Sequence, residues 1–146
     1  MKRITVLLAD DNKGVRREFR KLLEIEADLE VVGEAKNGVE AVSMAKKLHP
    51  ALILMDLTMP LLNGLDATRQ ILKAALATKI LMLSVHTDDM CVEAAVNSGA
   101  MGYLVKYSAA DIVCSAIREV QKGNTFFSPS IPRRFHKRSS KKHPSN

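Results

Sequence analysis

Short apolar runs alternate with amphipathic stretches five times along the first 123 residues. Apolar runs of this length, bounded by turn residues, are typical of strands that are buried on both faces of a parallel sheet. The stretches between them carry apolar residues at helical spacing. The pattern predicts five strands, each followed by a helix, with the strands at residues 4–9, 29–35, 52–55, 79–84 and 103–105.

This alternation predicts an α/β fold, because strands that alternate with helices of 10–15 residues form βαβ units around a parallel sheet. Right-handed crossovers then place helices on both faces of the sheet. At 146 residues the chain has about the length of one domain. In such sheets, ligands bind at the edge where the carboxyl ends of the strands meet.

The charge is unevenly distributed, although the whole chain has a formal net charge of +6. Residues 132–146 hold six basic residues and no acidic ones, so the rest of the chain is balanced at 16 basic and 16 acidic residues. We therefore predict a folded domain over residues 1–123 and a disordered basic linker or tail over residues 124–146. The basic residues of the first helix are predicted to form a solvated face; they are Arg16, Arg17, Arg20 and Lys21.

Hydrophobicity and cysteine content both favour a cytoplasmic protein that does not bind membranes. The first apolar run has only six residues, too few for a signal peptide, and no stretch approaches the ~20 residues of a membrane span. Cys91 and Cys114 are 23 positions apart and have no metal-ligand spacing with any of the four histidines. Reduced thiols are therefore predicted rather than a disulfide or a metal site.

Polar side chains follow four of the predicted strands. Three carboxylates that lie close together repel one another and need a cation, and carboxylate oxygens suit Mg²⁺. A lysine and a hydroxyl group are suited to hold phosphoryl oxygens. The combination predicts a site where a carboxylate accepts a phosphoryl group with metal assistance. Its members are Asp10 and Asp11 after the first strand, Asp56 at the end of the third, Ser84 after the fourth and Lys106 after the fifth.

These residues stand in recognisable motifs: Asp10-Asp11, then Asp56-Leu57-Thr58-Met59-Pro60 with Gly64, then Ser84, then Gly102-Tyr103-Leu104-Val105-Lys106. In this order they resemble the receiver domain of bacterial two-component response regulators, over about residues 1–123. The resemblance implies a flavodoxin-like (βα)5 three-layer sandwich with strand order 2-1-3-4-5. It also implies that Asp56 accepts its phosphoryl group from a histidine kinase.

The resemblance further implies a metal site and its ligands. Asp11, Asp56 and the backbone carbonyl of Thr58 would bind Mg²⁺ or Mn²⁺, with Asp10 acting directly or through water. Lys106 would pair with the phosphoryl oxygens.

The resemblance also implies a two-state switch. Ser84 would move to hydrogen-bond the phosphoryl group, and Tyr103 would turn inward as it does. Thr58 and His86, each two positions after a site residue, would tune the access of hydrolytic water. Phosphorylation is expected to promote formation of a homodimer.

The stretch from Gly123 to Pro129, with Arg133-Arg134 beyond, resembles the junction that follows the receiver domain in NarL/FixJ-type regulators. Those proteins continue into a LuxR-type helix-turn-helix domain that binds DNA and controls transcription. Only 24 residues follow Lys122, too few for a second domain of the usual size. DNA binding is therefore expected only through an output domain that this chain lacks. The alternative is a natural single-domain response regulator that acts through protein–protein contacts.

Two hypotheses from other functional classes fit the sequence less well. A haloacid-dehalogenase-type phosphatase needs a second aspartate two positions after its nucleophile, where this chain has Thr58. A flavodoxin-like binding module needs a hydroxyl- and glycine-rich phosphate loop, whereas Asp10-Asp11-Asn12 would repel a phosphate unless a metal intervened. We therefore expect a domain that phosphorylates itself from a donor and dephosphorylates slowly, not a turnover enzyme.

Overall fold

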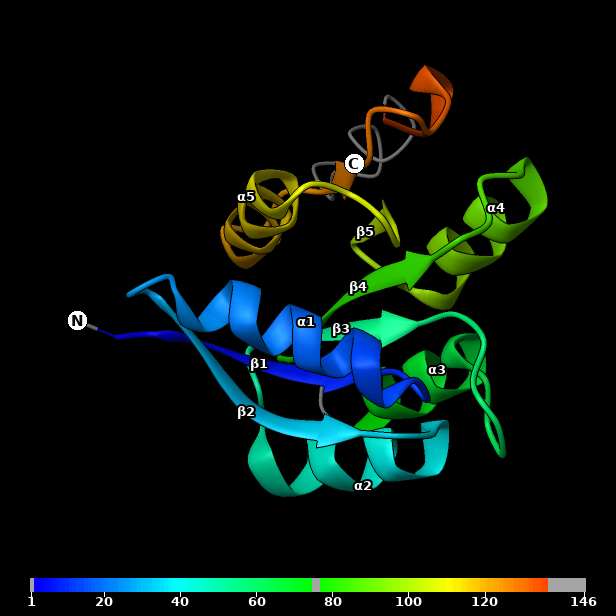
Figure 1. Cartoon of the computed structure of the whole chain (residues 1–146). Helices are drawn as coiled ribbons and strands as arrows, with labels where there is room; N and C mark the ends of the chain where they lie inside the picture. Colours follow the sequence, from blue (N-terminus) through cyan, green and yellow to red (C-terminus); the bar gives the residue numbers. More distant parts are fainter. Residues whose placement is uncertain (1, 75–76, 137–146) are drawn as a thin grey trace.

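A six-stranded parallel sheet forms the centre of the molecule in the computed structural model, which describes residues 2–74 and 77–136 (Figure 1). The strand order is β2-β1-β3-β4-β5-β6. The predicted order 2-1-3-4-5 is thus confirmed, with one additional strand at the β5 edge. The strands are β1 (Ile4–Ala9), β2 (Leu29–Ala35), β3 (Leu52–Asp56), β4 (Lys79–Ser84), β5 (Gly102–Val105) and β6 (Phe126–Phe127).

Helices cover both faces of this sheet (Figure 1). Successive side chains of a strand point to opposite faces, so alternate strand residues belong to two separate apolar clusters. One cluster joins the strands to α1 (Lys13–Glu24) and α5 (Ala110–Gln121). The other joins them to α2 (Gly38–Leu48), α3 (Gly64–Ala74) and α4 (Asp89–Ser98).

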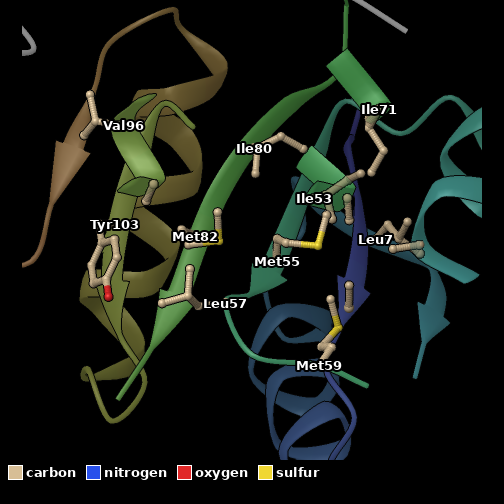
Figure 2. Packing of buried hydrophobic residues seen from close by; sticks show 14 of the residues in the cluster. Leu7, Ile53, Met55, Leu57, Met59, Ile71, Ile80, Met82, Val96 and Tyr103 are labelled. Atoms are coloured by element: carbon tan, nitrogen blue, oxygen red, sulfur yellow. The ribbon is translucent and has the colours of Figure 1, made fainter. Parts of the chain in front are cut away.

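Figure 2 shows the cluster on the face that α2, α3 and α4 cover. Its strand residues include Leu7, Ile53 and Met82, all fully buried. Close packing on both faces fixes the central strands, so the loops at their carboxyl ends start from fixed positions. No helix in the part of the chain that the structure describes is long and apolar enough to span a membrane.

The C-terminal segment, residues 124–136, differs from the sequence prediction. It was expected to be part of a disordered linker, but Phe126 and Phe127 form β6 and pair with Gly102 and Tyr103 of β5. Further along, Ile131 and Phe135 are only 2% and 1% exposed, in the cluster on the α2–α4 face. The prediction of disorder is wrong for these residues because they have apolar surface to bury. The rest of the predicted tail, 137–146, lies outside the described residues.

Ser128 ties the C-terminal segment to β5 beyond the short β6 pairing. Its backbone N–H donates to the carbonyl oxygen of Tyr103 at 3.0 Å. Its side-chain oxygen, Oγ, accepts a hydrogen bond from the backbone N–H of Val105 at 2.9 Å. Ser128 is buried, so these bonds form away from water. The C-terminal segment is therefore hydrogen-bonded to β5, the strand that leads to Lys106.

Candidate functional site

Three of the predicted site residues meet at the carboxyl edge of the sheet. The Lys106 ammonium nitrogen, Nζ, lies 3.0 Å from Oδ2 of Asp10 and 3.3 Å from Oδ2 of Asp56. Asp10 and Asp56 are 3% and 4% exposed, whereas Asp11 is exposed. The edge therefore holds a lysine between two buried carboxylates, with a third carboxylate at the surface.

The sheet register and one glycine place Asp56 at this edge. β1 and β3 are neighbours in the sheet, with Ala9 opposite Met55, so Asp10 and Asp56 follow side by side. Behind Asp56, the start of α3 comes very close, because a Cβ at Gly64 would lie only 2.2 Å from the Asp56 carbonyl oxygen. Only glycine allows the backbone to approach this closely, which explains its place in the motif.

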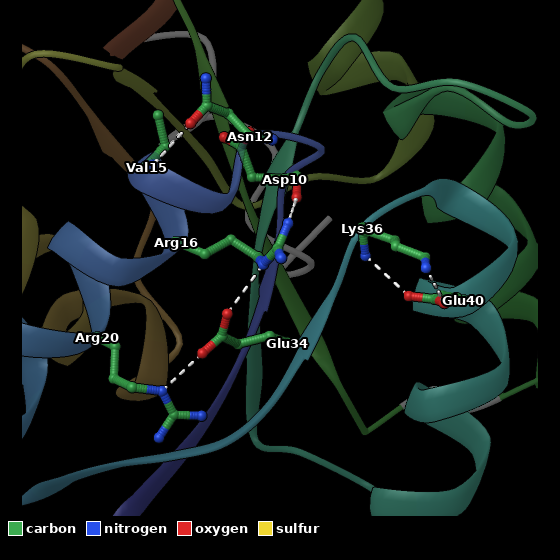
Figure 3. A network of polar contacts seen from close by, with 8 residues as sticks. All are labelled: Asp10, Asn12, Val15, Arg16, Arg20, Glu34, Lys36 and Glu40. Atoms are coloured by element: carbon green, nitrogen blue, oxygen red, sulfur yellow. Dashed lines mark hydrogen bonds and ion pairs between the residues drawn. The ribbon is translucent and has the colours of Figure 1, made fainter.

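An arginine–glutamate network holds the main chain at Asp10 (Figure 3). The Arg16 guanidinium donates to the Asp10 carbonyl oxygen at 2.7 Å and to the Glu34 carboxylate at 2.9 Å. Arg20 donates to the other Glu34 oxygen at 2.7 Å. This hydrogen bond from Arg20, more than that from Arg16, holds the pKa of Glu34 below its usual range. The predicted solvated face is therefore wrong for Arg16, which is partly buried and pairs with Glu34 of β2 and with the Asp10 main chain.

The three carboxylates fit a magnesium ion. Asp10, Asp11 and Asp56 each offer one oxygen, and these oxygens lie within 4.8 Å of one another. Although Lys106 lies nearby, Oδ2 of Asp10 is buried and accepts no well-directed hydrogen bond in the described part of the chain. A donor set made only of oxygens, with two or more carboxylates, is what hard cations prefer. The cluster is typical of a Mg²⁺ site.

The electrostatics of the edge shift the pKa values of Asp56 and Lys106. Burial, and then the negative charge of Asp10, raise the pKa of Asp56 to about 6. Burial alone would lower the pKa of Lys106, but its contacts with Asp10 and Asp56 outweigh that effect and raise it. Lys106 therefore stays protonated, and Asp56 is mainly ionised at neutral pH.

The raised pKa of Asp56 predicts that the metal-free protein loses stability as the pH rises from about 4 to about 6. An aspartate with a raised pKa in the folded state binds its proton more tightly there than in the unfolded chain. Its ionisation therefore favours unfolding. Relative to Asp56→Asn, we expect a loss of about 2 kcal/mol at neutral pH, less than the full shift implies because water reaches this edge.

Urea denaturation of wild type and Asp56→Asn, at several pH values and without divalent metal, measures this difference. A free-energy difference between the two proteins that stays constant across this pH range would contradict the prediction.

The two predicted switch residues both contact the backbone of His86. The buried Oγ of Ser84 accepts a hydrogen bond from the His86 N–H at 3.0 Å. The Tyr103 hydroxyl donates to the His86 carbonyl oxygen at 2.9 Å. Burial raises the pKa of Tyr103 to about 12, so its hydroxyl remains a donor. In this structure Tyr103 occupies an inward position, with 0% exposure.

The two predicted tuning residues lie at the surface beside the edge. Thr58 is exposed, and its backbone N–H makes a long hydrogen bond of 3.4 Å to Oδ1 of Asp56. The His86 side chain is also exposed, although its backbone is engaged with Ser84 and Tyr103. Both side chains are therefore accessible from solvent.

The sheet order, together with an edge that holds three carboxylates and a lysine, defines a phosphoacceptor module of the flavodoxin-like class. The family model "Response regulator receiver domain" matches residues 6–118, and the chain belongs to this family. It is accordingly a phosphoacceptor signalling module, and membership implies a cognate histidine kinase as partner.

The similar proteins are longer response regulators of the NarL/LuxR type. The transcriptional regulatory protein LiaR of Bacillus subtilis is 42% identical over 120 residues, which cover 82% of this chain and 57% of LiaR. The response regulator UvrY of Escherichia coli K12 is 41% identical over 128 residues, 88% of this chain and 59% of UvrY. The chain therefore spans less than two thirds of the length of these relatives.

A solved structure supports the fold over nearly the whole chain. The two-component response regulator of the LuxR family from Aurantimonas sp. SI85-9A1 matches with a TM-score of 0.87 at 30% identity. The match covers 95% of this chain and 99% of that structure.

Proposed function

We propose that Asp56 accepts a phosphoryl group from a histidine kinase and thereby switches the conformation of this domain. The observation that carries the proposal is the position of Lys106, whose ammonium group contacts Asp10 and Asp56 together at 3.0 and 3.3 Å. A lysine held against the acceptor carboxylate is placed to pair with the oxygens of an incoming phosphoryl group. The neighbouring carboxylates supply the ligands for a metal ion.

In the proposed reaction, an ionised Asp56 oxygen attacks the phosphorus atom in line with the leaving nitrogen of a phosphohistidine. The new O–P bond forms as the P–N bond breaks, and the released imidazole takes a proton from water. Asp10, Asp11, Asp56 and the Thr58 carbonyl would hold Mg²⁺ or Mn²⁺. When bound, such an ion neutralises charge on the phosphoryl oxygens. Lys106 adds a second positive charge and remains protonated throughout.

The response to phosphorylation is proposed to pass through Ser84 and Tyr103. The Ser84 hydroxyl already lies at the edge, where a phosphoryl group on Asp56 would offer it new acceptor oxygens. Tyr103 would be held in its inward position by the hydrogen bond to His86. The exposed side chains of Thr58 and His86 would influence how readily water reaches the phosphorylated carboxylate.

The output is proposed to be control of transcription through a helix-turn-helix DNA-binding domain. This rests on the names of the relatives, which include transcriptional regulatory proteins and a LuxR-family regulator. In this chain, the C-terminal segment follows α5 and is hydrogen-bonded to β5. A conformational change in β5 would therefore be transmitted to this segment. Homodimer formation on phosphorylation stays a prediction.

Incubation of the protein with acetyl phosphate and Mg²⁺ tests this proposal. We expect intact-mass measurement to show a single phosphoryl addition, because Asp56 is the one proposed acceptor. The addition should be lost when a chelator removes the metal, since three neighbouring negative charges would then repel the donor. Equal phosphorylation with and without metal would overturn the role of the acidic cluster.

A further inference from the structure

We propose that His86, Asp88 and Cys91 form a second metal site, selective for zinc over magnesium, where the loop after β4 meets the first turn of α4. Their ligand atoms lie within 4.8 Å of one another, and they are separate from the acidic cluster at the sheet edge. The sequence spacing indicated no metal site for either cysteine. In the structure, the turn that begins α4 folds the chain back and brings His86 beside Cys91, a proximity that the spacing alone does not show.

Local structure holds two of the three ligands in place. Asp88 is the N-cap of α4, and its Oδ2 accepts a hydrogen bond from the Cys91 backbone N–H at 3.3 Å. Capping interactions of this kind fix the side chain of the N-cap over the first helical turn. Asp88 and Cys91 are thus neighbours wherever α4 forms. His86 is held from the other side by its backbone bonds to Ser84 and Tyr103.

The chemistry of the set distinguishes it from the acidic cluster. Imidazole, thiolate and carboxylate are the ligands of zinc sites, whereas magnesium takes oxygen ligands only. Three protein ligands leave the fourth tetrahedral position for water. On binding, zinc would displace the Cys91 thiol proton, which passes to solvent, and form a Zn–S bond. Both His86 and Asp88 are exposed, so solvent reaches the site.

Only a small adjustment would close the site. Zn–N, Zn–O and Zn–S bonds of the usual length place tetrahedral ligands about 3.3–3.6 Å apart, whereas the ligand atoms here lie within 4.8 Å of one another. The inward movement required is on the order of 1 Å and falls on the exposed side chain of His86, because Asp88 keeps its capping position. Rotation of a surface side chain supplies a movement of this size without disturbing the core.

A metal at this position would restrict the His86 main chain, which accepts the hydrogen bond from Tyr103. Zinc would therefore favour the inward position of Tyr103. This consequence rests on the proposed function of Tyr103 as a switch, whereas the metal site itself does not.

Titration of the full chain with Co²⁺ in excess Mg²⁺ tests the site, because Mg²⁺ competes for the acidic cluster and only a cysteine ligand gives thiolate-to-cobalt charge-transfer absorption. We expect one Co²⁺ bound per chain, with an absorption band that one equivalent of Zn²⁺ removes. Cys91→Ser should abolish the band. The matched control Cys114→Ser should retain it, since Cys114 is buried on the other face of the sheet.

Asp88→Asn gives a second variant that keeps the helix cap, because asparagine also accepts the capping hydrogen bond. We expect its Co²⁺ affinity to fall at least about tenfold, with His86→Ala behaving similarly. A missing band, or one that persists in Cys91→Ser, would overturn the proposal. Phosphorylation of Cys91→Ser from acetyl phosphate in Mg²⁺ should match wild type, so failure of the zinc site and failure of the phosphoacceptor site are separable.

Discussion

Replacement of Asp56 by asparagine is expected to abolish phosphorylation from acetyl phosphate. The amide that replaces the carboxylate has no anionic oxygen to attack phosphorus, and it also loses the ion pair that Asp56 forms with Lys106. Intact-mass measurement after incubation with the donor and Mg²⁺ should show only the unmodified chain. The fold should persist, because asparagine has nearly the same shape and removes a buried charge.

Asp66→Asn provides the matched control. Asp66 also lies near the carboxyl edge of the sheet, in the first turn of α3, but it is exposed and pairs with Arg69. The same chemical change at Asp66 should leave the phosphoryl addition at the wild-type level. A phosphoryl addition that survives in Asp56→Asn would refute the assignment of Asp56 as the acceptor.

Replacement of Phe135 by alanine is expected to destabilise the protein by about 3–5 kcal/mol, the usual range for truncation of a buried phenylalanine. Phe135 is 1% exposed and belongs to the same apolar cluster as Tyr103 and Val92. The Arg134 guanidinium also stacks 4.4 Å from its ring centre. Truncation would leave a cavity between the C-terminal segment and α4. Urea denaturation with a two-state fit measures the change.

Tyr107→Ala serves as the reference for loss of an aromatic ring without burial. Tyr107 is 84% exposed, so its removal should change the free energy of unfolding by no more than about 0.5 kcal/mol. If Phe135→Ala were as mild as Tyr107→Ala, the C-terminal segment would not be an integral part of the fold.

The central sheet was predictable because its signal is local. Strands at 4–9, 29–35 and 79–84 have the same bounds in the sequence prediction and in the structure. The strands at 4–9 and 79–84 are largely apolar runs, and burial on both faces of a parallel sheet demands that composition. The strand at 29–35 includes Glu30 and Glu34 and was predicted from its centre, Val31-Val32. The convergence of Asp10, Asp56 and Lys106 followed from topology alone, because parallel strands bring their carboxyl ends to one edge.

The features that the sequence did not reveal depend on contacts between distant residues. Arg16 looked like one more surface charge, because its partner Glu34 lies on a different element, 18 residues away. In the C-terminal segment, the basic and proline-rich composition led to a prediction of disorder despite four apolar residues, Phe126, Phe127, Ile131 and Phe135. The available signal was the spacing of Ile131 and Phe135, four positions apart as on one face of a helical turn.

The pairing of β6 with β5 has a practical consequence for the design of chimeric regulators. A fusion joined directly after residue 123 would remove β6, which covers the outer side of β5, and leave the N–H of Val105 without its Ser128 acceptor. An uncovered edge strand invites pairing with other chains, so such a hybrid would be prone to aggregate. A junction placed after residue 136 keeps that edge covered. It also keeps an attached domain joined to β5 through the hydrogen bonds of β6 and Ser128.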